Sequence, residues 1–145
     1  MTAFTADPKH FTVAGAYYPT DHVFAMFADA AAAQAAATRM AEVPDVGAVQ
    51  LAEPGAIQRT FAKRAADVGG APSVGREDQF MLRFVELARA GCCGLLIHVD
   101  EADPEAIAAA LAGHSVELAY LYRFLVIEEL LESSKRAEDA AAGEF

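Results

Sequence analysis

The feature that most constrains the fold of this chain is a pattern that occurs twice. An apolar run, Val23–Ala28, is followed by an aspartate, an alanine-rich stretch and a second apolar run, Ala48–Ala52. The run Gly94–Val99 is again followed by an aspartate, an alanine-rich stretch and an apolar run, Val116–Tyr122. Apolar runs of this length are typical of buried strands, and alanine has the highest helix propensity. The repetition indicates two β-α-β units that share one sheet.

The helices of these units have recognisable starts. Asp29 stands directly before the first alanine run, and Asp103 stands directly before a proline. An aspartate at the start of a helix accepts hydrogen bonds from the free amides of the first turn, where proline is tolerated because no amide is needed. We predict β-α-β units over residues 22–53 and 93–123, within a single α+β domain over residues 21–123.

The segment between the two units has a helical pattern. Apolar residues recur at helical spacing on both sides of the Gly69-Gly70 pair: Ile57, Phe61, Ala65 and Val68 before it, and Phe80, Met81, Phe84, Leu87 and Ala88 after it. Such spacing places apolar side chains on one face of a helix. We predict a helical hairpin over residues 55–91 that packs Phe61, Phe80 and Phe84 inward.

The two ends of the chain carry weaker signals. Residues 1–20 contain two prolines and a glycine and show no sustained period. We predict an irregular arm there, with a short strand near Phe11–Ala14. Over residues 124–145 we predict a C-terminal helix and tail, acidic at its start and carrying Lys135 and Arg136 later.

Composition and charge argue against several classes of protein. A chain of 145 residues falls in the range of one domain, and its net charge of −10 argues against a general nucleic-acid binder. Its apolar runs are shorter than the roughly 18 residues that a membrane span needs, and the first residues lack the pattern of a secretory signal. The two cysteines, Cys92 and Cys93, are adjacent, which suits a reducing cytosol. We expect a cytoplasmic protein that binds neither nucleic acid nor membranes.

Three stretches of the chain carry a family resemblance: VFAMFADAAAAQAA, RFVELARAGCCGLLIHVDEADPEAIAAAL and YRFLVIEEL. They are similar to the bacterial general-stress-protein family of small α+β domains described as 17M-like, over roughly residues 22–130. The glycine-rich hydrophobic stretch that some members carry between the two halves is absent from this sequence. The resemblance implies a ferredoxin-like sheet, a bacterial source and a stress-associated role, and it brings no catalytic residues.

Candidate chemical groups are few, and each has a structural alternative. His98 lies within an apolar strand and could ligate a metal or a haem iron, but Cys92 lies on the order of 20 Å away along an extended strand, and structural zinc takes four ligands. Cys92 and Cys93 lack the Cys-x-x-Cys spacing of redox dithiols. Asp29 and Asp100 follow equivalent strands, where each can serve as a cap or turn residue instead of an acid or base. We predict no catalytic residue, metal site or cofactor, and buried, unreactive cysteines.

A pocket for a small ligand is a further possibility. An arm that carries aromatic and polar residues can close over a pocket, and the segment over residues 59–89 is basic in an otherwise acidic chain. Such a segment suits an acidic partner or a small anion, as well as a solvated helix face. The residues expected to bind a ligand are Tyr17, Tyr18, His22, Arg59, Lys63, His98, Tyr120 and Tyr122.

The absence of chemical motifs favours a non-enzymatic protein that acts through self-association or a protein partner. The alternatives are a small-ligand sensor, a haem- or metal-binding protein, or an enzyme, using a pocket between the sheet and the central helices. Right-handed crossovers place the helices of both β-α-β units on one face of the sheet. The opposite face is also apolar, so either the central helices or a second subunit must cover it. We predict a homodimer with a sheet face or a sheet edge in its interface.

Overall fold

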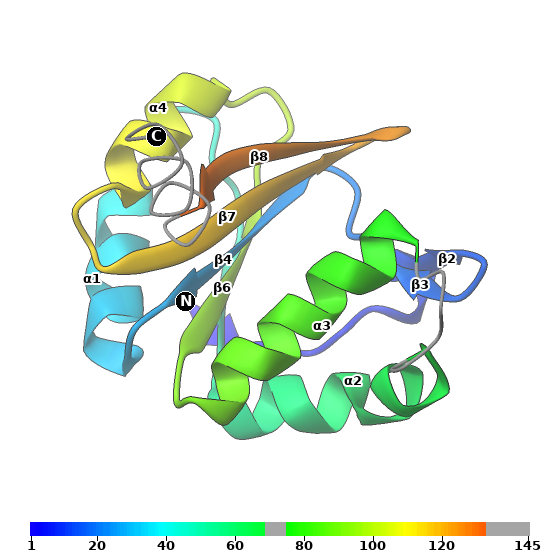
Figure 1. Cartoon of the computed structure of the whole chain (residues 1–145). Helices are drawn as coiled ribbons and strands as arrows, with labels where there is room; N and C mark the ends of the chain where they lie inside the picture. The colour runs from blue at the N-terminus through cyan, green and yellow to red at the C-terminus, as the bar shows by residue number, and fades with distance from the viewer. Residues whose placement is uncertain (69–74, 133–145) are drawn as a thin grey trace, which may run out of the picture.

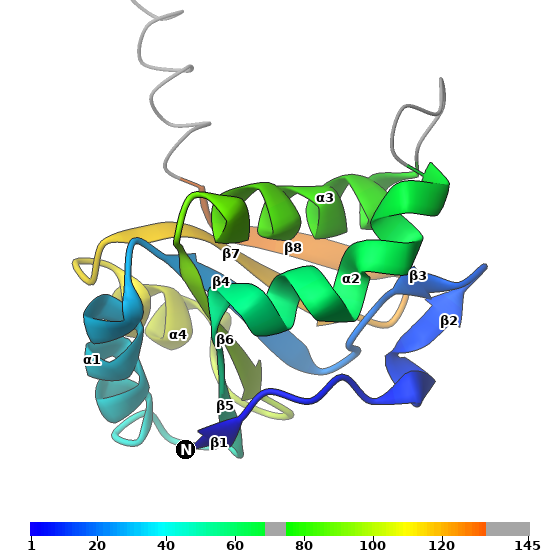
Figure 2. The same cartoon turned by 90° about the horizontal axis from the view of Figure 1, so that it is seen from below.

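The computed structural model describes residues 1–68 and 75–132. A six-stranded mixed sheet lies between two pairs of helices, with a small two-stranded sheet beside it (Figures 1 and 2). The helices are α1 (Ala30–Met40), α2 (Pro54–Val68), α3 (Arg76–Arg89) and α4 (Pro104–Leu111), with a 3-10 turn, η1 (Pro8–His10). The main sheet contains β1 (Thr2–Ala3), β4 (His22–Phe27), β5 (Val49–Ala52), β6 (Cys93–His98), β7 (Val116–Arg123) and β8 (Val126–Glu132), and the small sheet contains β2 (Phe11–Val13) and β3 (Ala16–Tyr17).

The order of the strands across the main sheet is β1-β5-β6-β4-β7-β8. Neighbouring strands are antiparallel, except for β1, which runs parallel to β5. The four strands predicted from the sequence repeat lie side by side in the middle of this sheet. The predicted α+β class is confirmed. The sheet is larger than two β-α-β units, because the arm adds β1 at one edge and the C-terminal segment adds β8 at the other.

α1 and α4 begin at the aspartates that were predicted to cap them. The Asp29 carboxylate accepts a hydrogen bond from the Ala32 amide at 2.8 Å, and the Asp103 carboxylate accepts one from the Glu105 amide at 3.1 Å. The two aspartates thereby satisfy amides that have no partner within the helix. Both helices pack on the same face of the sheet (Figure 1), which we call the alanine side.

Side chains along each strand alternate between the two faces of the sheet. On β4, Val23, Ala25 and Phe27 point to the alanine side, whereas Phe24 and Met26 point to the face covered by α2 and α3. We call this second face the aromatic side. Its buried aromatic rings are those of Phe4, Tyr17, Tyr18, Phe24, Phe61, Phe80, Phe84, Tyr120 and Tyr122.

The central helices form the predicted hairpin and cover the aromatic side (Figure 2). Phe84 stacks on Phe24 of β4 with ring centroids 4.3 Å apart, and Phe80 stacks on Tyr120 of β7 at 4.1 Å. Phe61, Phe80 and Phe84 are all buried, as predicted. Since the chain's own helices cover this face, the sheet face predicted for the homodimer interface is not open to a second subunit. The homodimer itself stays a prediction.

The prediction of a C-terminal helix is wrong for residues 126–132, which form β8 at the edge of the sheet. β8 pairs with β7, and it buries Ile127 on the aromatic side and Leu131 on the alanine side. Pairing and burial outweigh the helix propensity of a segment rich in glutamate and leucine. Residues 133–145 of the predicted helix and tail lie outside the described residues.

The arm over residues 1–20 has more regular structure than predicted. β1 joins the edge of the main sheet, where the Phe4 amide donates to the Leu51 carbonyl at 2.8 Å. The predicted short strand corresponds to β2, which pairs with β3. This small sheet lies beside the end of α2 (Figures 1 and 2), so the arm closes one end of the aromatic side.

Candidate functional site

Five of the eight predicted ligand-binding residues gather at one end of the aromatic side. They are Tyr17, Tyr18, His22, His98 and Tyr122. His22 of β4 stands opposite His98 of β6 and Tyr122 of β7, so their side chains lie on the same face. The arm brings Tyr17 and Tyr18 to this end, where their ring centroids lie 6.4 Å and 5.2 Å from that of Tyr122.

A sixth residue, His10, belongs to the group and was not predicted. Its ring centroid lies 5.1 Å from that of His22, which lies 4.9 Å from that of His98. We call these three side chains the histidine row. η1 positions His10, because its amide donates to the Asp7 carbonyl at 2.9 Å and its carbonyl accepts from the Tyr18 amide at 2.5 Å. The row thus joins η1, β4 and β6.

The three histidines differ in their hydrogen bonds. His22 Nδ1 lies 2.9 Å from the Thr20 carbonyl oxygen, which can only accept, so Nδ1 carries a proton. His98 Nε2 lies 3.1 Å from Asp100 Oδ1. His10 Nδ1 is buried and has no hydrogen-bond partner within the described residues. Buried polar atoms without a partner are uncommon, and each calls for strain, a water molecule or a ligand as its explanation.

Burial shifts the pKa of two of the three histidines, His10 and His22. Burial lowers the pKa of His10, and the Asp7 carboxylate opposes this effect in part. Burial also lowers the pKa of His22, where the hydrogen bond to Thr20 and the charge of Asp21 oppose the effect and the neighbouring histidines reinforce it. Because the ordinary pKa of histidine is about 6.5, His10 and His22 are neutral at physiological pH.

Two tyrosine hydroxyls of this group are buried away from any hydrogen-bond partner among the described residues. The Tyr18 hydroxyl donates to the Arg123 carbonyl at 2.5 Å. In the part of the chain that the structure describes, the hydroxyls of Tyr17 and Tyr122 have no hydrogen-bond partner, although both side chains are fully buried. Burial raises the pKa of Tyr17 and of Tyr122 well above the ordinary range. Both phenols therefore stay protonated, so they can donate hydrogen bonds but cannot act as bases.

The other three predicted residues do not join this group. The Tyr120 hydroxyl donates to Glu132 at 2.9 Å, and Arg83 pairs with the same carboxylate, which ties β7 and β8 to α3. Burial raises the pKa of Tyr120 to about 12. Arg59 and Lys63 are exposed on α2, where they line separate grooves. The eight residues therefore do not line one pocket between the sheet and the central helices.

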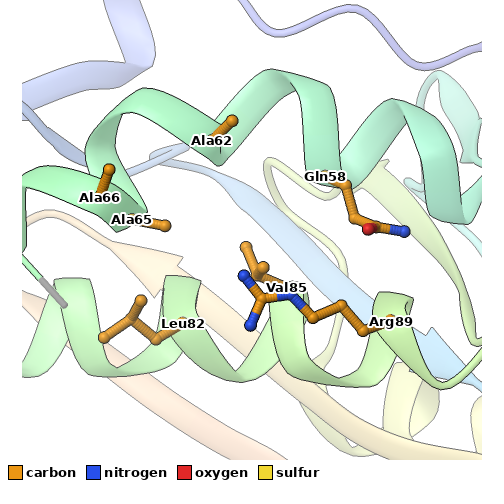
Figure 3. Close-up of a pocket in the computed structure, with 7 residues that line it drawn as sticks. All are labelled: Gln58, Ala62, Ala65, Ala66, Leu82, Val85 and Arg89. Atoms are coloured by element: carbon orange, nitrogen blue, oxygen red, sulfur yellow. The ribbon is translucent and has the colours of Figure 1, made fainter.

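A groove of about 400 Å³ lies between α2 and α3 (Figure 3). Small and apolar side chains form most of its wall, and the lining residues are Gln58, Ala62, Ala65, Ala66, Leu82, Val85 and Arg89. Gln58 lies toward one end, and the Arg89 side chain reaches from that end to Val85 (Figure 3). Binding sites for small molecules usually place several polar groups around the ligand. This groove has polar groups from only two side chains, so it is a weaker candidate than the histidine row.

The two cysteines are free and buried on opposite faces of the sheet. Cys92 packs on the aromatic side and Cys93 on the alanine side. Burial raises the pKa of both thiols, which disfavours the reactive thiolate. The prediction that these cysteines are buried is confirmed. Within residues 1–68 and 75–132, no three His, Cys, Asp or Glu side chains are arranged to hold a metal ion.

The turn between β7 and β8 carries an exposed apolar group in a segment that was predicted to be helical. Phe124, Leu125 and Val126 are 80%, 81% and 55% exposed. They form the tip of the β7–β8 hairpin, which projects beyond the helices at the upper right of Figure 1, and we call them the hairpin tip. Leu125 has a φ of 68°, a left-handed conformation that favours glycine or asparagine. Because this turn contains neither glycine nor asparagine, the local pattern predicted a helix.

Comparisons with known proteins do not supply a relative from which a role could be transferred. The chain matches no protein-family model, no curated protein and no solved structure. Among the helices of residues 1–68 and 75–132, none is both long and apolar enough to cross a membrane. The features of this chain that bear on its function are the histidine row, its tyrosines and the hairpin tip.

Proposed function

We propose that this protein is a non-enzymatic binding protein that acts through self-association or a protein partner, with the hairpin tip as its contact surface. The observation that carries the proposal is the exposure of three consecutive large apolar side chains, Phe124, Leu125 and Val126. Among the described side chains, Met1 is the other large apolar one that is exposed. Contiguous apolar surface in water is unfavourable and marks sites of contact.

The backbone of the hairpin tip supports the same proposal. A non-glycine residue in the left-handed conformation of Leu125 costs roughly 1–2 kcal/mol. Aspartate and asparagine adopt this conformation more readily than a bulky apolar residue such as leucine, and strain at an unusual residue is concentrated at functional positions. The tip is also held in shape, because Arg123 pairs with Glu128 across the strands at 3.6 Å and the Arg123 carbonyl accepts the Tyr18 hydroxyl. A rigid apolar tip loses little conformational entropy when it binds.

Light scattering behind a sizing column tests this proposal. The wild-type protein is expected to run as a homodimer, or to carry a protein partner when it is isolated from its native host. Leu125→Gly is the most informative variant, because it removes an exposed apolar side chain and also relieves the positive φ, so the fold keeps its stability. We expect this variant to bind a second copy or its protein partner at least about tenfold more weakly, as when an interface hot spot is removed.

Asp45→Gly is the matched control for this experiment. Asp45 is also exposed and has a φ of 65°, but it lies in the loop after α1. Its replacement should leave association unchanged. A wild-type protein that runs at its monomer mass of 15.3 kDa without any partner contradicts the proposal, as does full association of Leu125→Gly.

We also propose the ferredoxin-like sheet, the bacterial cytoplasmic location and the stress-associated role. The order β5-β6-β4-β7, with each neighbour antiparallel, supports a ferredoxin-like arrangement of the four central strands. The two free cysteines support a location in a reducing bacterial cytoplasm. The stress-associated role depends on the resemblance alone.

A second candidate function is the binding of a small ligand beside the histidine row. It is favoured by three buried polar atoms without hydrogen-bond partners within the described residues: His10 Nδ1 and the hydroxyls of Tyr17 and Tyr122. A molecule that both donates and accepts hydrogen bonds would satisfy them. Native mass spectrometry of the protein from its own host tests this function. An adduct that is lost in Tyr17→Phe and Tyr122→Phe supports it, and ligand-free wild-type protein contradicts it.

A further inference from the structure

We propose that the histidine row is an acid-sensitive latch that holds residues 5–17 of the arm against the aromatic side and releases them when its imidazoles gain protons. Three of the chain's four histidines lie in a row, with neighbouring ring centroids 5.1 Å and 4.9 Å apart, although they come from η1, β4 and β6. This latch goes beyond the proposed function, because it concerns the movement of the arm and not the hairpin tip.

The arm can move without disturbing the main sheet. β2 and β3 pair with each other and not with the six-stranded sheet. The arm is fixed at its start, where the Phe4 amide bonds to Leu51 of β5, and at its end, where the chain continues into β4. Residues 5–17, between these fixed points, can therefore separate from the body while the strands of the main sheet stay paired.

Side chains hold this part of the arm in place. Phe11 and Tyr17 pack against Phe61 of α2, with ring centroids at 6.2 Å and 4.8 Å from the Phe61 ring, and His10 packs against His22. The aromatic contacts do not titrate near neutral pH, because the pKa of Tyr17 is raised. The contact between the two imidazoles does titrate, so the histidine row is the acid-sensitive part of this attachment.

Charged groups surround the row on the elements that carry it. The acidic groups are Asp7 beside His10, Asp21 beside His22, and Asp100 beside His98. The Asp7 carboxylate already accepts a hydrogen bond from the Lys9 amide at 2.9 Å, and the Lys9 side chain is exposed. The ring of Tyr17, 6.3 Å from that of His10, is uncharged. Burial outweighs the charge of Asp7 at His10 and that of Asp21 at His22, and a protonated His10 and a protonated His22 would also repel each other.

The direction of the acid effect follows from proton linkage. With the arm closed, burial lowers the pKa of His10 and His22. When the arm opens, water reaches both rings and their pKa returns toward about 6.5. The open state then binds more protons below that pH, so the closed state loses stability as the pH falls. Above that pH both rings are neutral in either state, and the closed arm keeps its full stability.

Hydrogen exchange followed by mass spectrometry tests the latch at about pH 7.5 and about pH 5, the range in which histidine switches act. After correction for the intrinsic effect of pH, peptides from residues 8–18 should exchange about tenfold faster at the lower pH, because the open arm then binds more protons than the closed arm. Peptides from β6 should keep their protection. The double variant His10→Asn/His22→Asn should lose most of the acid response, because asparagine does not titrate and its side-chain amide can still donate to Thr20.

His114→Asn is the matched control, because His114 is the fourth histidine and lies in the turn before β7. It should keep the full acid response. If circular dichroism shows that the double variant does not fold, His10→Asn alone carries the test. Three results would each overturn the proposal: arm exchange that does not change with pH, an acid response that persists in the folded histidine variants, and loss of β6 protection together with that of the arm.

Discussion

The two sides of the sheet are covered in different ways. On the alanine side, α1 and α4 pack on the strands mainly through alanine, valine, leucine and isoleucine. On the aromatic side, α2, α3 and the arm pack through stacked rings and bury tyrosine hydroxyls among them. Apolar side chains need only a matching shape, whereas buried polar atoms also need partners. The buried polar atoms that have no partner among the described residues therefore lie on the aromatic side. Tyr18 connects that side to the hairpin tip through its hydrogen bond to Arg123.

The largest expected contrast between the two sides is in packing. Phe84→Ala removes a fully buried ring from the aromatic side and should cost about 3–5 kcal/mol of unfolding free energy in urea titrations. Ala36→Gly, within α1 on the alanine side, should cost only about 1 kcal/mol. A loss of less than about 1 kcal/mol for Phe84→Ala would show that the ring is not part of a packed core.

The second contrast concerns ion pairs. Arg83→Met leaves the buried Glu132 without its cation and should cost about 2–3 kcal/mol. Arg39→Met breaks the exposed pair with Glu42 on α1 and should cost less than about 0.5 kcal/mol. Urea titrations of both variants measure the difference. Equal losses of unfolding free energy would mean that the Arg83–Glu132 pair is as well solvated as the Arg39–Glu42 pair.

A smaller contrast lies within the tyrosine group. Tyr122→Phe removes a buried hydroxyl without a described partner, so it should leave stability unchanged or raise it by up to about 1 kcal/mol. Tyr18→Phe removes a hydroxyl that donates to Arg123, so it should cost about 1 kcal/mol. Thermal melts of the two variants give the comparison. A clear loss for Tyr122→Phe would reveal a partner, such as a bound water or ligand.

The smallest effect is expected at the cysteines. Cys92 and Cys93 face opposite sides, and their raised pKa values keep both thiols protonated. Each should react with a thiol reagent at least about tenfold more slowly in the native protein than in denaturant. Replacing both with alanine should leave association through the hairpin tip intact. Fast native modification that abolishes association would contradict a structural role for these residues.

The alanine side was the more predictable of the two, because its signals are local. Asp29 and Asp103 start their helices by accepting hydrogen bonds from nearby amides, and the alternation along β4 is visible in the sequence. The hairpin of α2 and α3 was also predictable, from the spacing of its apolar residues. The sequence did not predict which element covers the aromatic side, because its pattern fits a second subunit equally well.

The remaining features depend on contacts between distant parts of the chain. β8 is stabilised by pairing with β7 across a turn of Phe124 and Leu125, which carries no turn signal. His10 reaches His22 only because η1 and the β2–β3 pair fold the arm back over the sheet. Neither its spacing nor its neighbours in the sequence single out His10, so the histidine row was predicted only in its two strand residues.

The role of the hairpin tip is tested most directly by NMR chemical shifts recorded while the protein is diluted. If the tip is the contact surface of a homodimer, amide shifts at residues 123–127 should change with concentration, and those of α1 and α4 should stay constant. When a partner is found instead, adding it should move the same resonances. Shifts that change on α1 and α4 while residues 123–127 stay constant would contradict the proposal, as would an unchanged spectrum in a protein without a partner.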